Sequence, residues 1–259
     1  AIGGGASTEE ARAIKDVQLS TIWRVLCTHL GEPPQSFLWQ YNDKDRVFHR
    51  EGEMTPVEFA TKYVDVPMSE YVCLVHDPRP EHPFGHTYTV EFLGNIVGGE
   101  QVIYLNVDMQ TMKKAAIETL ESGEPVWFGC DVGKQFQRQV GLWDASLFDY
   151  EGLYGTPEGM DKAARLALHH TAMTHAMLFT GVDVLDGASR RWRVENSWGD
   201  DGVGRKGFQL MNDNWFDEYV FEIAAHHSRL SPALQKAMEL PPTVLPPWDP
   251  MGALARNGA

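Results

Sequence analysis

The sequence has 259 residues, of which 43% are hydrophobic and 22% are charged, a composition typical of globular proteins long enough to bury a substantial core. The formal net charge of −14 repels a phosphate backbone, so we expect no nucleic-acid partner. No apolar run approaches the roughly 18 residues of a membrane-spanning helix, so no membrane association is expected either.

The N-terminal part contains clear starts of helices and strands. Ser7-Thr8-Glu9-Glu10 is a capping-box pattern, and the apolar spacing after it predicts a helix that ends at Gly31. Short strands are predicted at 37–41 and 46–49 around a polar turn. A second helix is expected to begin at Thr55-Pro56, with proline at its first position.

Strand patterns dominate the rest of the chain. Strands are predicted at 71–75, 87–93, 102–107, 125–132, 176–184, 191–197, 207–211 and 218–224. Helices are predicted at 108–123 and 161–170 and from Ser231, and 241–250 is expected to be an extended, proline-rich tail. This order predicts an α+β fold. We divide it into a helical and mixed part at 1–150, a β-rich part at 151–240 and an extended arm at 241–259.

The most informative segment, Trp192 to Gly199, contains Asn-Ser-Trp-Gly, and Asn196 follows His175 by 21 positions. This spacing resembles the second half of a papain-like cysteine protease site. The resemblance implies that the imidazole of His175 is the base for a thiol, that Asn196 orients the ring, and that Trp198 shields their hydrogen bond from water. The alternative interpretation is a core histidine and a turn asparagine.

No cysteine in the chain has the surroundings of such a nucleophile. Cys27 falls within the first predicted helix, Cys73 lies within a predicted strand, and the negative charge of Asp131 disfavours a thiolate at Cys130. We expect all three to be small buried hydrophobic side chains. Three cysteines also make a disulfide framework implausible and favour a reducing, intracellular compartment.

We expect no metal site and no cofactor. Pro83 and Gly85 break any helix that could align His82 with His86, and the side chains of the adjacent pairs His169-His170 and His226-His227 are expected to diverge. The glycine-rich stretches lack the spaced glycines and Lys-Ser/Thr of a phosphate-binding loop.

Longer motifs are similar to the bleomycin hydrolase family, which includes bacterial aminopeptidase C. They lie at 74–80, 126–134, 173–177, 192–199 and 245–255. The resemblance implies the C-terminal part of a papain-like cysteine peptidase fold, with a β-rich His/Asn subdomain and helical insertions. It also implies a cytoplasmic homohexamer that cleaves N-terminal residues from peptides and hydrolyses the bleomycin amide. Its C-terminal arm, ending near Ala255, would place a carboxylate in the cleft, against the free amine of the substrate.

The chain departs from this family in two places. The family's segment with a glutamine and a Cys-Trp nucleophile has no counterpart here, so we expect a nucleophile-bearing N-terminal half as partner and an inactive chain without it. Residues 256–259 extend past the usual arm, which puts strict aminopeptidase behaviour in question. The alternative function is a non-catalytic binding or assembly module of the same fold.

Overall fold

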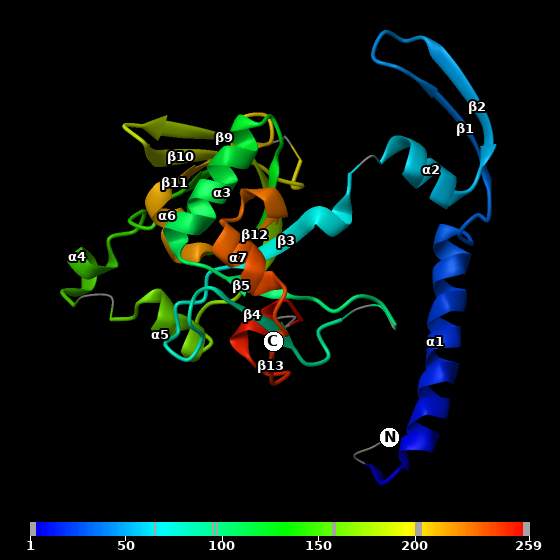
Figure 1. Ribbon diagram of the computed structural model, residues 1–259, viewed down its shortest axis with the longest axis horizontal. Coiled ribbons are helices and arrows are strands. Elements are labelled where there is room, and N and C mark those ends of the chain that lie inside the picture. The colour runs from blue at the N-terminus through cyan, green and yellow to red at the C-terminus, as the bar shows by residue number, and fades with distance from the viewer. Residues whose placement is uncertain are drawn as a thin grey trace. The chain divides into compact units, whose positions relative to one another are not determined.

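The computed structural model describes residues 4–64, 66–94, 96, 98–156, 159–199 and 204–255. The chain divides into two compact units, Ala1–Pro67 and Met68–Ala259, which are drawn in Figure 1. Within the described ranges, no helix combines the length and the apolar character needed to cross a membrane.

The first unit begins with helix α1 (Thr8–Leu30), which starts at the predicted capping box. The hydroxyl of Ser7 accepts a hydrogen bond from the backbone N–H of Glu10, and the Glu10 carboxylate accepts one from the backbone N–H of Ser7. No residue of α1 is buried. Its apolar side chains, among them Val17 and Trp23, are exposed within this chain.

A β-hairpin and a short helix complete the first unit. Strands β1 (Phe37–Asn42) and β2 (Phe48–Met54) pair antiparallel, and α2 (Pro56–Tyr63) follows. The second strand begins later than predicted because the Asp43 carboxylate accepts hydrogen bonds from the backbone N–H groups of Asp45 and Val47, which keeps this segment in a turn. Aromatic rings from β1 and α2 form the contact between them.

The second unit is built on one sheet. Its strands are β3 (Tyr71–Val75), β4 (His86–Val90), β5 (Tyr104–Asn106), β6 (Val126–Cys130), β7 (Phe136–Gln137), β8 (Leu142–Trp143), β9 (His175–Leu185), β10 (Ala188–Glu195), β11 (Phe208–Asn212), β12 (Val220–His226) and β13 (Thr243–Leu245). Their order in the sheet is β13-β4-β5-β3-β12-β6-β9-β10-β11-β8-β7. The sheet therefore contains strands from all three predicted parts, 1–150, 151–240 and 241–259. This division of the chain stays a prediction.

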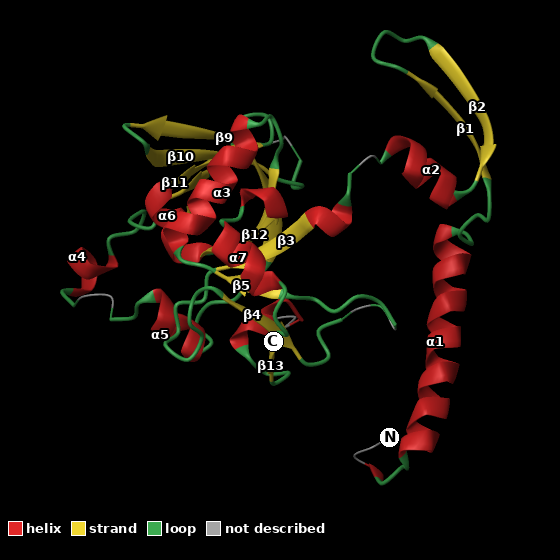
Figure 2. Cartoon of the chain, viewed as in Figure 1, coloured by secondary structure: helices red, strands yellow, loops and turns green. Residues whose placement is uncertain are grey.

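Helices cover one face of this sheet. Helix α3 (Met109–Glu121) packs on β6, β9 and β12, and α6 (Asp213–Tyr219) packs on β10, β11 and β12, as Figure 2 shows in red against yellow. The aromatic core between them contains Phe128 and Phe179, with ring centroids 3.7 Å apart, and Trp192 and Phe216, with centroids 4.7 Å apart. Burying such large apolar side chains is the main favourable contribution to folding.

The remaining helices are short. They are α4 (Tyr150–Tyr154), α5 (Lys162–Ala167), α7 (Pro232–Met238) and the 3₁₀ helices η2 (Met68–Glu70), η3 (His227–Arg229) and η4 (Pro250–Ala255). Helix α6 falls where the sequence predicted a loop and the start of a strand. Three aromatic residues of α6, Trp215, Phe216 and Tyr219, are buried, so core packing outweighs the modest helix propensity of such residues.

The C-terminal arm packs on the face of the sheet opposite the one that α3 and α6 cover. Strand β13 pairs in parallel with β4, so the tail that we predicted to be extended is also hydrogen-bonded into the sheet. Leu245 and Met251 join a second buried cluster that contains Val90 and Tyr104. Successive side chains of a strand point to opposite faces of the sheet. Leu74 therefore belongs to the cluster that contains the aromatic core, and the next residue, Val75, belongs to this second cluster.

A buried ion network fixes the arm to the loop after β3. The Arg79 side chain is 5% exposed and donates to the Asp77 carboxylate at 2.6 Å and to the Asp249 carboxylate at 2.7 Å. His82 Nδ1 lies 2.9 Å from Asp77 Oδ2. Burial by itself would raise the pKa of Asp77, but the hydrogen bonds from His82 and Arg79 outweigh it and lower that pKa to about 2. Asp77 is therefore ionised at neutral pH and pairs with the guanidinium.

We predict that Asp249→Asn loosens the arm and lowers the free energy of unfolding by about 2 kcal/mol, because it weakens a charge-assisted hydrogen bond to the buried guanidinium while Asp77 still pairs with it. Urea unfolding measures the loss, and hydrogen exchange at the Met251 and Gly252 amides reports release of the arm. The matched control is Glu81→Gln, since Glu81 is 59% exposed and 3.9 Å from Arg79. Equal destabilisation by both variants would contradict this role of Asp249.

Candidate active site

Two neighbouring strands bring His175 and Asn196 together. His175 is the first residue of β9, and Asn196 directly follows the last residue of β10. Strands β9 and β10 are antiparallel, with Glu195 opposite Leu178, so the start of one lies beside the end of the other. His175 Nε2 is 2.9 Å from Asn196 Oδ1.

The hydrogen bonds around Asn196 define the tautomer of His175. Asn196 Oδ1 also accepts from the backbone N–H of Ser197 at 2.8 Å, and Asn196 Nδ2 donates to Gln209 Oε1 at 3.3 Å. An amide oxygen can only accept, so Nε2 of His175 carries the proton that it donates to Asn196. In the neutral ring, Nδ1 is then unprotonated and can act as a base.

The ring of Trp198 lies against the ring of His175. The two rings stack with centroids 5.1 Å apart and an interplanar angle of 28°. The Phe136 ring packs against Trp198 at 5.9 Å, and the Arg138 guanidinium lies 5.2 Å from the Trp198 centroid. Covering a hydrogen bond with apolar surface strengthens it, because the local dielectric constant falls.

Three of these contacts come from residues that the sequence did not single out. Gln209 is 4% exposed in β11 and lies on the same face of the strand as the fully buried Met211, whereas Leu210 between them is exposed. The apolar pattern of the sequence therefore does not mark Gln209 as buried. Its Nε2 has no hydrogen-bond partner among the described residues. Phe136 and Arg138 lie in β7 and the turn after it, where no periodic pattern marks them.

The segment that leads into β9 is fastened to the end of β6. The backbone N–H of Thr174 donates to the carbonyl of Cys130 at 2.9 Å, and the hydroxyl of Thr171 donates to the buried Asp131 carboxylate at 2.9 Å. A Cβ at Gly129 would lie 2.1 Å from the sulfur of Met173. Glycine at this position therefore lets Met173 pack on β6 two residues before His175.

The sequence profile of the peptidase C1-like family matches residues 1–252. The chain belongs to the peptidase C1-like family. It is 45% identical to bleomycin hydrolase of Homo sapiens over 260 residues, which cover 98% of this chain and 57% of that protein. It is also 41% identical to aminopeptidase C of Listeria monocytogenes over 247 residues, covering 95% of this chain and 56% of that enzyme.

The fold agrees with this membership. The crystal structure of PepW from Lactobacillus rhamnosis HN001 superposes with a TM-score of 0.90 and 42% sequence identity, covering 97% of this chain and 57% of that chain. The predicted α+β, papain-like peptidase fold and the predicted resemblance to bleomycin hydrolase and aminopeptidase C are thus confirmed. The chain spans somewhat more than half the length of the relatives it matches.

Two of the three cysteines have thiols with a raised pKa. Cys130 lies opposite His175 in the β6–β9 pair but is fully buried, and burial together with the Asp131 charge raises the pKa of its thiol. Burial and the nearby Glu222 also raise the pKa of Cys73. Cys130 is buried as predicted, whereas Cys73 and Cys27 are only half-buried, and Cys27 belongs to the other compact unit.

The C-terminal arm lines a small cavity together with the segment that leads into His175. Met251 lines a cavity of about 30 Å³ together with Met173, His76 and Phe221. Burial lowers the pKa of His76 to about 3, so its ring is neutral there. Ala255, the residue we predicted to end the arm, is the last residue of η4. Residues 256–259, which we expected to extend past the usual end of the arm, lie outside the described residues.

Three further histidines, His82, His226 and His227, belong to two clusters of ionisable side chains. His82 belongs to the buried network in which Arg79 donates to Asp77 and Asp249, and its Nδ1 lies beside Asp77. The rings of His226 and His227 stack with centroids 4.6 Å apart, so our expectation that this pair diverges was wrong. The strand ends at His226, which is the N-cap of η3, so the alternation of side chains does not continue to His227.

We predict that Gln209→Leu loosens the orientation of Asn196 and changes the tautomer ratio of His175 roughly fivefold toward Nδ1–H, because one hydrogen bond contributes about 1 kcal/mol. Nitrogen-15 spectra of the imidazole measure this ratio in the chain itself. Gln137→Leu, at an exposed position in β7, which β8 separates from β11, is the control and should leave the ratio unchanged. An unaltered ratio in Gln209→Leu would show that Gln209 does not position Asn196.

Proposed function

We propose that this chain is the C-terminal portion of a cysteine aminopeptidase, in which it supplies His175 as general base and Asn196 as the residue that orients it. The observation that carries the proposal is the hydrogen bond from His175 Nε2 to Asn196 Oδ1 beneath Trp198, in a chain of the peptidase C1-like family. This bond leaves Nδ1 as the ring nitrogen that faces the reaction.

The reaction follows from that arrangement. Nδ1 of His175 takes the proton of a cysteine thiol, and the thiolate attacks the carbonyl carbon of the first peptide bond. The imidazolium then protonates the leaving amine as the carbon–nitrogen bond breaks, which leaves an acyl-enzyme. His175 next takes a proton from water, whose oxygen attacks the thioester, and the proton returns to the thiol as the acid product departs. Throughout, Asn196 keeps Nδ1 directed at the sulfur.

The thiol belongs, in this proposal, to a nucleophile-bearing N-terminal half. Two observations support this: the chain spans 57% of the length of human bleomycin hydrolase, and burial raises the pKa of the thiols of Cys73 and Cys130. A thiol with a raised pKa is protonated at neutral pH and is a poor nucleophile. The chain without its partner half is therefore expected to be inactive.

Selectivity for N-terminal residues is assigned to the C-terminal arm. The Asp249 clamp and the packing of Met251 direct the arm toward Met173, two residues before His175. A carboxylate at the end of this arm, near Ala255, would pair with the free amine of a peptide and stop longer substrates from passing. The names of the relatives, aminopeptidase C and bleomycin hydrolase, agree with peptide and amide substrates.

Location and assembly complete the proposal. On the family resemblance we expect a cytoplasmic enzyme that assembles as a homohexamer. The exposed apolar side chains of α1 supply surface that an assembly would cover. The alternative, a non-catalytic binding or assembly module, is favoured by the raised pKa of the thiols of Cys73 and Cys130, and the same experiments separate the two.

The first experiment is intact-mass spectrometry of the purified protein after treatment with a thiol-directed epoxide. We predict that this chain carries no adduct at Cys73 or Cys130 and that a nucleophile-bearing half, when present, carries one. Peptide mapping assigns the site, and Cys130→Ala controls for the thiol opposite His175. An adduct on Cys130 would contradict the assignment of the nucleophile to another segment.

A second experiment tests the base. In an enzyme reconstituted with its nucleophile-bearing half, His175→Ala should reduce turnover by at least about 10³-fold, the scale of losing a base that also activates the nucleophile, with assembly unchanged by light scattering. His170→Ala, in the turn after α5, is the matched control. Unchanged turnover in His175→Ala would overturn the catalytic proposal, and full assembly without any wild-type turnover would favour the non-catalytic module.

A further inference from the structure

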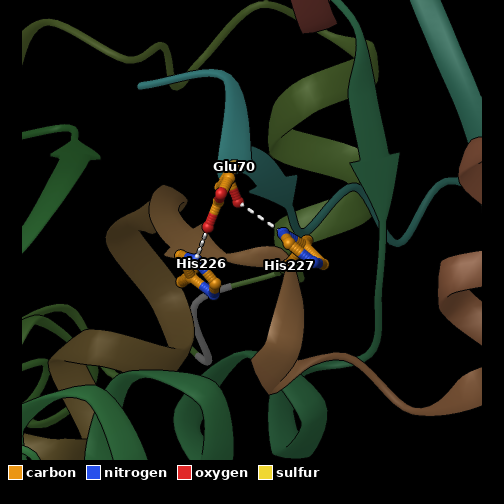
Figure 3. Close-up of side chains that lie close together, drawn as sticks. All are labelled: Glu70, His226 and His227. Atoms are coloured by element: carbon orange, nitrogen blue, oxygen red, sulfur yellow. Dashed lines mark hydrogen bonds and ion pairs between the residues drawn. The ribbon is translucent and has the colours of Figure 1, made fainter. Parts of the chain in front are cut away.

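Glu70, His226 and His227 form a second cluster of ionisable side chains in the second unit (Figure 3). His226 Nε2 lies 2.6 Å from Glu70 Oε2, and His227 Nδ1 lies 3.1 Å from the backbone oxygen of Glu70. One possible ligand atom from each of the three residues lies within 4.8 Å of the others. Imidazole nitrogen and carboxylate oxygen are ligands that zinc binds in proteins.

Local backbone geometry explains why two adjacent histidines can serve one site. Side chains alternate along a strand, but His226 is the last residue of β12 and the N-cap of η3. The turn lets both histidines face Glu70, as the two dashed lines from Glu70 in Figure 3 show. Glu70 ends η2, directly before β3, and Tyr71 is paired with His226 across the strands.

Further contacts orient the ring of His226. Its Nδ1 lies 2.7 Å from the Ser228 hydroxyl and 3.2 Å from the Ser228 backbone nitrogen, and the Tyr71 ring packs edge-on against it at 5.5 Å. When Nε2 binds a metal, the ring proton resides on Nδ1 and can be donated to the Ser228 hydroxyl, at the expense of the longer contact with the backbone N–H. Of these two contacts, only the one with the Ser228 hydroxyl supports a ligating Nε2, because a hydroxyl can accept from Nδ1–H and hold the ring in place.

The cluster lies far from the candidate catalytic pair. Val220, at the start of β12, is opposite Cys130, which is itself opposite His175. His226 is six positions further along β12, roughly 20 Å at the rise of a strand. The cluster is therefore too far from His175 to take part in the proposed thiol chemistry.

We propose that Glu70, His226 and His227 bind a zinc ion. With metal–ligand distances of about 2.1 Å, tetrahedral ligands are roughly 3.4 Å apart. On binding the ion, the distance between Glu70 Oε2 and His226 Nε2 therefore increases from 2.6 Å. Rotation of the exposed side chains of Glu70 and His227 brings the third ligand atom, on His227, closer to these two. Water fills the fourth position. The ion joins η2 to the end of β12, which are 156 positions apart in the chain, and thereby closes a long loop of the unfolded chain.

The test is a zinc titration of this chain, free of purification tags, in a Cys27→Ser background that removes a half-buried thiol. Competition with a chromophoric zinc chelator measures affinity, and a thermal melt with and without zinc measures stabilisation. We expect one zinc ion per chain and a higher melting temperature. Glu70→Gln and His227→Gln should each weaken binding by 10-fold or more, the scale for perturbing a metal site.

The matched control is His29→Gln, which removes an exposed histidine in the other unit and should change affinity less than twofold. Glu70→Gln preserves side-chain size, and a melting temperature without zinc close to that of the parent shows that the fold is intact. Cobalt substitution adds a spectroscopic check, because a four-coordinate site gives strong visible absorption. Absence of saturable binding, or equal affinity in the parent and both ligand variants, would overturn the site.

Discussion

The register between β9 and β10 is the constraint on which the candidate site depends. A slip of one residue would turn every side chain of a strand to the opposite face and separate His175 from Asn196. The core maintains this register: Trp192 of β10 is fully buried against Phe179 of β9, and its indole N–H donates to Asp213 at 2.9 Å. Large apolar side chains therefore determine where a hydrogen bond of 2.9 Å can form.

The same sheet connects the candidate base with the arm. Strand β13 extends the sheet beside β4, and the Arg79 guanidinium links Asp77 to Asp249 at the base of the arm. Removing one partner of a buried ion pair is costly, so this network, the β13–β4 pair and the packing of Met251 together hold the arm against the sheet. A fixed arm agrees with its proposed role, which is to hold a carboxylate at a set distance from the catalytic residues so that it binds the free amine of a peptide substrate.

The sequence predicted the outline of the fold because its signals are local. The capping box at Ser7 and the strand at Tyr71–Val75 follow from spacing alone. Helix α6 escaped prediction because its stability comes from tertiary burial of aromatic residues. For the candidate site, His175, Asn196 and Trp198 were found through their resemblance to a known pattern. Gln209 and Phe136 were not, because their roles arise from strand neighbours distant in sequence.

Gln209 has a consequence for how this region can evolve. Its amide oxygen accepts from Asn196, while its buried nitrogen has no partner among the described residues. A buried donor without a partner costs about 1–3 kcal/mol, so an apolar residue of similar shape, such as methionine, would be the more stable choice. Selection for stability alone would thus remove this glutamine. Its persistence in a lineage would record selection on the orientation of an asparagine, and its loss in a relative would mark a chain released from that task.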